Sequence, residues 1–334
     1  MKRQRVDIEA LADWGNLYLA LWKAARGKRR RPDVQDFLAD HERRLARLRE
    51  QILNGRLLLD RYRCFRIRDP KPRDIVAVSF ELRVLHHAIM NLIGENLERS
   101  QIHNSYACLP VRGVHAAVLQ VQKKLRRAEW YVKIDIEKYF ENIDHRRLLE
   151  RLRRRFKGER FLALLGDIIA SYETRPRKGL PIGSLTSQYF ANFFQEPIDR
   201  FIERLPETRG YVRYMDDMIW FCDDKRAARA SLKQMVVRIE AEDLVVKPQR
   251  QIQPCRGGVS WCGFRIQPHR ILLSRRKKRA YKGHLERWQA QWLAGRIDAL
   301  ALQQAADAIH ALTLPAQSLG FRRAALARIP RLEA

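Results

Sequence analysis

The sequence predicts an α+β fold in which a mixed sheet carries helices on one face. Three observations lead to this prediction: an alternating apolar segment at residues 130–136, two short alternating segments around residues 211–222, and helical spacing before, between and after them. The order strand, helix, helix, hairpin, helix, strand is typical of one sheet assembled from distant segments. With 46% hydrophobic residues, the 334-residue chain can bury a substantial core, and its length suits one large domain or two to three smaller ones.

The N-terminal part is expected to be helical with one hairpin. Residues 8–58 show helical spacing around the basic run Arg26-Gly27-Lys28-Arg29-Arg30-Arg31, which is either a solvated face or a phosphate-binding loop. Residues 61–79 alternate around Asp69-Pro70-Lys71-Pro72-Arg73 and predict a hairpin with a rigid, positive turn. A further helix fits residues 81–97.

The central part supplies the first acidic strand. Trp130, Val132, Ile134 and Ile136 alternate with Tyr131, Lys133 and Asp135, so the strand presents Asp135 opposite its apolar set. A helix is expected from about Asp144, then a glycine-punctuated loop over residues 179–184, then helical spacing through residues 190–205.

The C-terminal part continues with alternating elements. A helix spans roughly residues 225–243, followed by a short strand at residues 244–246 and a second hairpin at residues 260–266. From residue 274 the chain is basic and helical, with Trp288 and Trp292 in its apolar stripe.

The run Tyr214-Met215-Asp216-Asp217 is the most informative feature for function. It lies between two alternating apolar segments and predicts two short strands that meet at an acidic turn. Adjacent carboxylates repel each other, but a pair of divalent ions about 3.5–4 Å apart, as used for displacement at phosphorus, requires them. The competing interpretation is a solvated turn, in which Asp is common. If Asp135 lies near this turn, three carboxylates form a two-metal site.

Bulk properties indicate a polyanionic partner. Lys and Arg total 66 against 38 Asp and Glu, a net charge of +28, which points to nucleic acid first and to a membrane surface second. No apolar run reaches the length of a spanning helix, and no signal-peptide core follows the start, so we expect a cytoplasmic protein without a membrane segment. The five cysteines include no C-x-x-C pair and are expected to be buried thiols in a reducing compartment.

Several segments, in order, resemble the reverse transcriptase family. Asp135-Ile136-Glu137-Lys138-Tyr139-Phe140 is similar to its first catalytic strand, and Tyr214-Met215-Asp216-Asp217 to its catalytic hairpin. The run from Gly179 to Gln188 is similar to its template and nucleotide loop, and Trp261-Cys262-Gly263-Phe264 to its primer grip. This many motifs in order, over about residues 10–290, are specific where one would be weak.

Within the family, the chain most resembles reverse transcriptases of bacterial diversity-generating retroelements. The segment Ile182-Gly183-Ser184-Leu185-Thr186-Ser187-Gln188 carries this resemblance, because intron and retroviral relatives usually have Gln before that Gly and Ser-Pro in place of Ser187-Gln188. Asn104-Ser105-Tyr106-Ala107-Cys108 and the Trp14–Arg30 region agree. Phe80-Glu81-Leu82-Arg83 and Ile309-His310-Ala311 depart from the subgroup pattern.

The resemblance implies a right-hand polymerase with fingers, a palm built on an RRM-like sheet, and a short helical thumb. It places an N-terminal helical extension at residues 1–60, fingers at 61–125, the palm at 126–270 with finger elements around 145–185, and a basic thumb at 271–334. It implies an RNA-directed DNA polymerase that copies an element-encoded template RNA into cDNA with errors directed to adenines. The implied ligands are two Mg²⁺ ions, dNTPs, template RNA and RNA/DNA hybrid. It also implies a small, basic, oligomeric accessory protein in a prokaryotic cytoplasm.

The resemblance also assigns roles to individual residues. Metal binding falls to Asp135, Ile136, Asp216 and Asp217, and catalysis to the three aspartates with Lys247 as a general acid. Nucleotide binding falls to Lys71, Arg73, Phe140, Ile182, Gly183, Gln188, Tyr214 and Met215, and the primer grip to Trp261, Cys262, Gly263 and Phe264.

Each assignment has a structural alternative. Lys71 and Arg73 could bind phosphate oxygens or be solvated surface cations. Lys247 could be a general acid or a solvated residue of a helix-to-strand turn. Phe140 would exclude a ribose 2′-hydroxyl or be a core aromatic. Ile182 lacks the amide that relatives use against the nucleotide, which predicts low fidelity.

His86 and His87 lie on a predicted helix among apolar residues. One of them is expected to face the core, and neither is expected to bind a metal ion.

Two other functions stay open at this point. The chain could be another bacterial reverse transcriptase, from a retron, an intron-like element or a phage-defence system. It could also be a catalytically inactive RNA-binding scaffold, although the presence of all three carboxylates argues against that.

Overall fold

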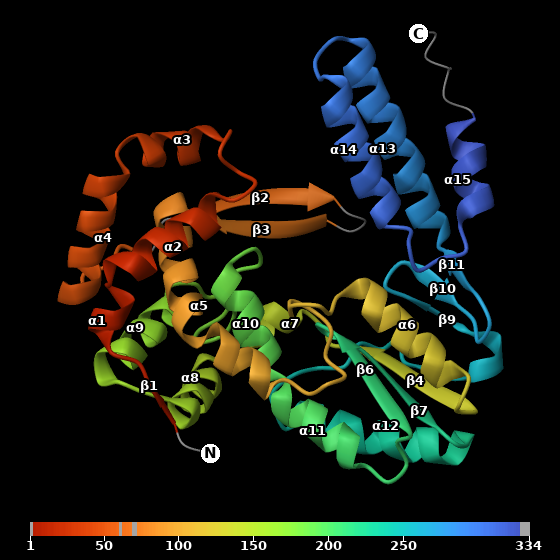
Figure 1. The fold of residues 1–334 in the computed structure, drawn as a ribbon. Coiled ribbons are helices and arrows are strands. Elements are labelled where there is room, and N and C mark those ends of the chain that lie inside the picture. The colour runs from red at the N-terminus through yellow and green to blue at the C-terminus, as the bar shows by residue number, and fades with distance from the viewer. Residues whose placement is uncertain (1–2, 60–61, 69–71, 328–334) are drawn as a thin grey trace. The chain divides into compact units, whose positions relative to one another are not determined.

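The computed structural model describes residues 3–59, 62–68 and 72–327 and divides into two compact units (Figure 1). The first unit contains residues 1–103, 136–201 and 236–246; the second contains residues 104–135, 202–235 and 247–334. Because each unit draws on three separate segments, neither is a contiguous stretch of chain. The domain boundaries expected near residues 60, 125 and 270 stay predictions.

Helices form most of the N-terminal part of the first unit, as the apolar spacing predicts. Local signals set their ends: Asp13 accepts a hydrogen bond from the Asn16 N–H and Ser79 from the Leu82 N–H, while Gly55 ends a helix at a φ of 65°. The helices are α1 (Ile8–Leu11), α2 (Trp14–Ala25), α3 (Pro32–Ala39), α4 (His41–Asn54) and α5 (Phe80–Ser100).

The predicted hairpin is present as antiparallel strands β2 (Tyr62–Arg68) and β3 (Pro72–Val78). The Val76 N–H donates to the Ile182 carbonyl at 2.9 Å, which ties β3 to the glycine-punctuated loop of residues 179–184. A second, parallel pair of strands, β1 (Gln4–Arg5) and β5 (Phe156–Lys157), has no counterpart in the sequence prediction.

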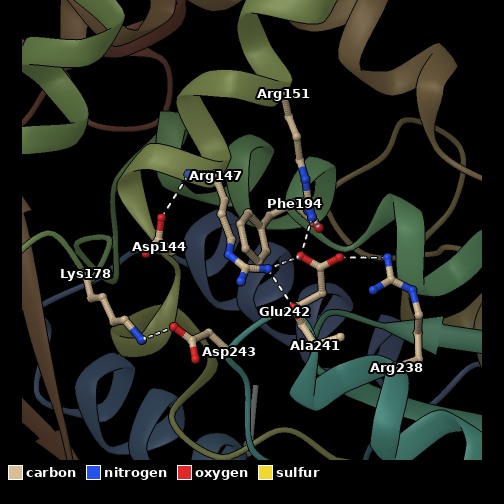
Figure 2. Close-up of polar contacts among 9 residues, drawn as sticks. All are labelled: Asp144, Arg147, Arg151, Lys178, Phe194, Arg238, Ala241, Glu242 and Asp243. Carbon is tan, nitrogen blue, oxygen red and sulfur yellow. Dashed lines mark hydrogen bonds and ion pairs between the residues drawn. The ribbon is translucent and has the colours of Figure 1, made fainter.

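The remaining helices of the first unit lie before and after that loop in the chain. Asp144 caps α8 by accepting from the Arg147 N–H at 2.9 Å, so the helix begins where the sequence predicts (Figure 2). The helices are α7 (Tyr139–Asn142), α8 (His145–Arg155), α9 (Glu159–Ala170), α10 (Leu185–Phe194) and α11 (Glu196–Arg204), of which α11 ends in the second unit.

A four-stranded sheet is the centre of the second unit. Its order is β6 (Gly210–Tyr214), β7 (Asp217–Cys222), β4 (Trp130–Asp135), β8 (Gln251–Pro254). All three pairings are antiparallel, so the expectation of a mixed sheet is wrong. The strand expected at residues 244–246 is reduced to one bridge between Val246 and Ile136, and β8 takes the edge beside β4 instead.

The sheet is covered on both faces, whereas the sequence predicts helices on one face. Ile219 and Phe221 of β7 pack in a cluster with α6 (Val114–Leu125), and the Trp220 indole donates to the Ser231 hydroxyl of α12 (Lys225–Glu240) at 2.9 Å. Figure 1 shows α6 beside the sheet. Burial on both faces explains why β7 is a continuous apolar run rather than an alternation.

The end of the second unit is a small sheet followed by helices. The predicted hairpin at residues 260–266 forms from β9 (Val259–Trp261) and β10 (Phe264–Ile266), with β11 (Ile271–Leu273) beside β10 and a 3₁₀ turn, η1 (Cys255–Gly257), before it. The basic helices are α13 (Arg275–Leu293), α14 (Ala299–Ala311) and α15 (Leu319–Leu326), which share a small core around Tyr281 and Ile309.

All five cysteines are free thiols. Cys222 and Cys255 are buried as predicted, but Cys64 and Cys108 are exposed because they lie on a hairpin strand and in a loop. Within the described residues, no helix combines the length and the apolar character needed to cross a membrane.

Candidate active site

Strands β6 and β7 meet at the turn Met215-Asp216. Met215 has a φ of 54°, in the left-handed region that non-glycine residues seldom adopt. The fully buried Arg213 donates from its guanidinium to the Met215 carbonyl at 3.2 Å and so stabilises this conformation. Local backbone strain of this kind is typical of functional sites. The sequence signal for Arg213 was a cation within an otherwise apolar strand, which our sequence analysis missed.

Asp135 lies directly opposite Asp217 on the neighbouring strand. The two residues are register partners at the end of the β4–β7 ladder, and opposed residues of an antiparallel pair have their side chains on one face. Asp216 is the next residue in the turn. Two carboxylates from strands and one from a turn are therefore neighbours within the second unit.

Lys247 binds the same strand end. Its backbone N–H donates to the Asp135 carbonyl at 2.9 Å, and its ammonium group forms an ion pair with Asp135 Oδ1. About a third of each side chain is exposed, 34% for Lys247 and 37% for Asp135. The residue that the resemblance places near pyrophosphate thus neutralises a predicted metal ligand.

Asp217 is the most electrostatically perturbed of the three acids. Burial raises the pKa of its carboxyl group to about 6, with Asp135 and Asp216 adding to the rise. Lys133 and the nearby indole N–H of Trp261 oppose that shift of the pKa, although the indole lies outside hydrogen-bond geometry. Asp217 Oδ1 is buried and accepts no hydrogen bond.

Carboxylate oxygens are the ligands that a divalent cation prefers, but the side chains of these acids are not grouped around one cation position. Within the described residues, no three His, Cys, Asp or Glu side chains are grouped to hold a metal ion. The two-metal site expected at Asp135, Asp216 and Asp217 stays a prediction; in this structure Asp135 is paired with Lys247. A hard cation would bind the unpaired Oδ1 of Asp217 and would reduce the repulsion between Asp217 and the carboxylates of Asp135 and Asp216. Ile136, also expected at the metal, has a fully buried side chain, so only its backbone carbonyl oxygen could bind a cation, and this role stays a prediction.

The expected primer-grip residues form the β9–β10 turn of the same unit. Trp261 and Phe264 are buried, and Cys262 and Gly263 make the turn with φ values of 46° and 80°. Lys277 lies 3.7 Å from the Phe264 ring centroid, and a Cβ on Gly263 would come within 2.6 Å of Lys277 Cε. Burial, followed by the negative charge of Asp217, raises the pKa of the Cys262 thiol. The turn therefore lies close to the acids.

Tyr214, the last residue of β6, was expected at the nucleotide. It is half-buried, and burial raises the pKa of its phenol. Met215, assigned the same role, is the strained residue of the acidic turn.

Other expected nucleotide-binding residues lie in the first unit. The loop of residues 179–184 is held by the Val76–Ile182 hydrogen bond and by the Leu180 N–H, which donates to the Phe140 carbonyl at 2.8 Å. Gly183 is exposed with a φ of 118°, and a Cβ there would lie 3.1 Å from Ile75 Cγ2. Phe140 and Ile182 are only half-buried, so neither is a plain core residue.

The positive turn of the β2–β3 hairpin is only partly described. Lys71 lies outside the described residues. The backbone of Arg73, in β3, pairs with that of Ile67, in β2. The side chain of Arg73 is not among the described parts of the structure. Their expected roles stay predictions.

A basic cavity of about 280 Å³ adjoins the Gly183 loop and was missed by sequence reasoning. Lys28, Arg83, His87 and Gln188 are among its lining residues. Burial lowers the pKa of Lys28 and of Arg83, and their positive neighbours lower both further. Arg83 Nε is buried with no hydrogen-bond partner. The cavity therefore has uncompensated positive charge, and part of it comes from the basic run that the sequence left open.

His86 and His87 behave as expected for residues on an apolar helix face. His86 is buried, and its Nδ1 lies 2.9 Å from the Ser184 hydroxyl. Burial lowers the pKa of His86 to about 3, and that of His87 to about 4, so both are neutral at pH 7.

Comparison with known proteins identifies the family. Residues 68–266, more than half of the chain, match the family described as "Reverse transcriptase (RNA-dependent DNA polymerase)". The chain belongs to this reverse transcriptase family, which confirms the resemblance at the family level.

Individual relatives are distant. The chain is 28% identical over 171 residues to Protein YkfC of Escherichia coli (strain K12), covering 46% of this chain and 45% of that protein. It is 24% identical over 141 residues to the group II intron-encoded protein LtrA of Lactococcus lactis subsp. cremoris, covering 40% and 24%. The matches thus span less than half of the length of these curated relatives.

Among solved structures, apo telomerase from Candida tropicalis, truncated from its C-terminal domain, is similar with a TM-score of 0.48. The sequence identity is 10%, over 65% of this chain and 55% of that chain.

Proposed function

We propose that this chain is an RNA-directed DNA polymerase that joins nucleotides at the acidic turn of the second unit. The observation that carries the proposal is the cross-strand placement of Asp135 against Asp217, with Asp216 in the adjoining turn. These three carboxylates would hold Mg²⁺, which activates a primer hydroxyl and neutralises the leaving pyrophosphate. The strand order of the sheet is compatible with an RRM-like palm.

The residues of this chain have defined tasks in that proposal. Asp217 must be ionised to bind a cation, so its raised pKa makes the site sensitive to pH. Lys247 forms an ion pair with Asp135 that orients the carboxylate until a cation arrives, and its ammonium group could afterwards protonate pyrophosphate. Trp261 and Phe264, buried beneath a rigid turn, would position the primer end.

The first unit would bind the nucleotide and template. Arg73 and Lys71 would contact triphosphate oxygens, Phe140 would discriminate against a 2′-hydroxyl, and Gly183 allows close approach of the loop backbone. The cavity at Lys28 and Arg83 supports binding of a phosphate beside this loop, because the buried Arg83 Nε has no hydrogen-bond partner and a phosphate oxygen would accept from it.

The finer proposal is a polymerase of a diversity-generating retroelement that makes adenine-directed errors. Ile182 supports it, since a half-buried aliphatic side chain provides no hydrogen bond to a nucleotide. Replacing Ile182 with Asn or Gln should lower misincorporation opposite adenine in a sequencing assay of the products. An unchanged error spectrum would contradict this role.

The second candidate is an intron-like bacterial reverse transcriptase, favoured by the similarity to LtrA, a group II intron-encoded protein. A faithful error spectrum on adenine templates would favour it over the first. In either case the proposed ligands are template RNA, RNA/DNA hybrid and dNTPs in a prokaryotic cytoplasm. A small basic oligomeric accessory protein is proposed for the retroelement case only.

A primer-extension assay with Mg²⁺ on an RNA template tests the shared proposal. Asp216→Asn should abolish extension while the thermal unfolding temperature stays near that of the wild type. Asp307→Asn, an exposed acid on α14, is the matched control and should extend normally. If the wild type itself adds no nucleotides, or if Asp216→Asn extends as well as the control, the inactive scaffold is the better description.

A further inference from the structure

An arginine cluster on α8 has no role in the proposed reaction. The helix has the sequence HRRLLERLRRR, and its buried residues are His145, Leu148 and Leu152. Its arginines are therefore distributed over the surface side, with Glu150 as the only acid of the helix. They are Arg146, Arg147, Arg151, Arg153, Arg154 and Arg155.

One buried carboxylate organises part of this cluster. Glu242, whose side chain is only 5% exposed, contacts Arg147 at 3.4 Å and Arg238 at 2.7 Å, and it also forms an ion pair with Arg151 (Figure 2). A single negative charge thus faces three positive charges. The local surplus is two positive charges in a partly desolvated setting, where screening by water is reduced.

The guanidinium groups are fixed in place by further contacts. Arg151 donates to the Phe194 carbonyl and lies 4.3 Å from the centroid of the Phe194 ring, and Arg147 donates to the Ala241 carbonyl. Each guanidinium has five N–H donors, whereas one carboxylate has about four acceptor positions for all three. Preorganised donors therefore remain available to an anion.

A pocket of about 370 Å³ opens beside this cluster, and every residue that lines it belongs to the first unit. Arg151, Arg154, Arg155 and Arg238 line it, against the acids Glu242 and Glu196. Glu196 is already paired with Arg200 at 2.7 Å. Arg154 is exposed, and its side chain makes neither a hydrogen bond nor an ion pair with the described residues.

We propose that this arginine pocket is a phosphate-binding site for the backbone of a folded RNA. The planar forks of arginine match phosphate oxygens, and the pocket volume falls in the range of small-ligand sites. Its aromatic residue, Phe193, is only 3% exposed and so offers no face for base stacking. The site would therefore read charge and backbone shape rather than sequence.

RNA is favoured over an acidic protein segment by two observations. The chain carries a net charge of +28, and the arginines repeat along a helix face, which suits a regular series of phosphates. None of the lining residues belongs to the proposed catalytic or nucleotide-binding set. Binding to this pocket can therefore be measured without dNTPs, and a failure of the proposed polymerase activity would leave that measurement interpretable.

The test compares two charge reversals on the same helix. Arg154→Glu changes a residue that lines the pocket, and Arg153→Glu changes an exposed neighbour that does not. Fluorescence anisotropy with a labelled hairpin RNA, over a series of salt concentrations, should show about tenfold weaker binding for Arg154→Glu, because one charge-assisted phosphate contact is lost. The slope of log affinity against log salt should fall by about one unit. Arg153→Glu should weaken binding by about twofold only, and Arg154→Lys should recover part of the loss.

Three outcomes would overturn the proposal. Equal losses for the two reversals would mean that only overall charge matters. Unchanged binding for Arg154→Glu would mean that the arginines have a structural role alone. A loss of polyglutamate binding, measured in the same way, without a loss of RNA binding would identify an acidic protein segment as the ligand. Circular dichroism of each variant verifies that the fold is retained.

Discussion

Replacing Lys247 with Met should lower the Mg²⁺ concentration needed for half-maximal primer extension. The ammonium group of Lys247 pairs with Asp135, so Lys247 and a metal ion compete for one carboxylate. Both side chains are about one-third exposed, 34% and 37%, which limits the pair to at most about 1 kcal/mol. Removing that competition should reduce the half-saturating Mg²⁺ concentration by up to about fivefold.

The assay is a Mg²⁺ titration of the initial extension rate. Lys233→Met, which removes an exposed lysine of α12, is the matched control and should leave the titration unchanged. The Lys247 variant should lose no more than about 1 kcal/mol of unfolding free energy. An unchanged or higher Mg²⁺ requirement would refute competition. If the maximal rate also fell, Lys247 would act as the general acid instead.

Three further results are expected. Extension should fall as the pH drops through about 6, because the raised pKa of Asp217 leaves its carboxyl group protonated below that value; a flat profile down to pH 5 would contradict this. The folded pKa of His86, about 3, lies below the unfolded value, so stability is complete above about pH 6.5 and falls below it. The His86 contribution to the loss between pH 7 and pH 5 should be about 2 kcal/mol in urea unfolding, so the loss should be smaller by that amount in His86→Asn, in which His87, with a pKa also lowered, still contributes. Gly183→Ala should cost about 1–2 kcal/mol by calorimetry, given its φ of 118° and the close Ile75, whereas Gly283→Ala in the open interior of α13 should stabilise by about 0.5–1 kcal/mol; equal effects would contradict the reasoning.

The sequence predicts most elements of this fold because their signals are local. Asp144 begins a helix, Ser79 caps another, and the run around Asp216 reads as a strand–turn–strand unit without knowledge of the rest. The sheet is different. Its antiparallel pairing, its edge strand β8 and its cover on both faces depend on contacts between distant segments, and an apolar run such as that of β7 does not reveal which face meets which helix.

The same limit applies to the candidate site. Residue types and motif order indicate Asp135 and Asp217, and the structure places them across one ladder. The ion pair of Lys247 with Asp135 joins residues 112 positions apart, and the cavity at Arg83 depends on a loop from another segment. Charge in a sequence therefore identifies candidates, but their partners are set by the folded chain.

The thiols provide a practical route to observing this molecule in solution. Burial raises the pKa values of the Cys222, Cys255 and Cys262 thiols, and desolvation by the surrounding protein raises the pKa of Cys108 although this residue reaches the surface. Thiolate is the form that maleimides attack. A substoichiometric fluorescent maleimide should attach first to the exposed Cys64 of strand β2, and would supply an optical reporter on the β2–β3 hairpin without any substitution in the chain.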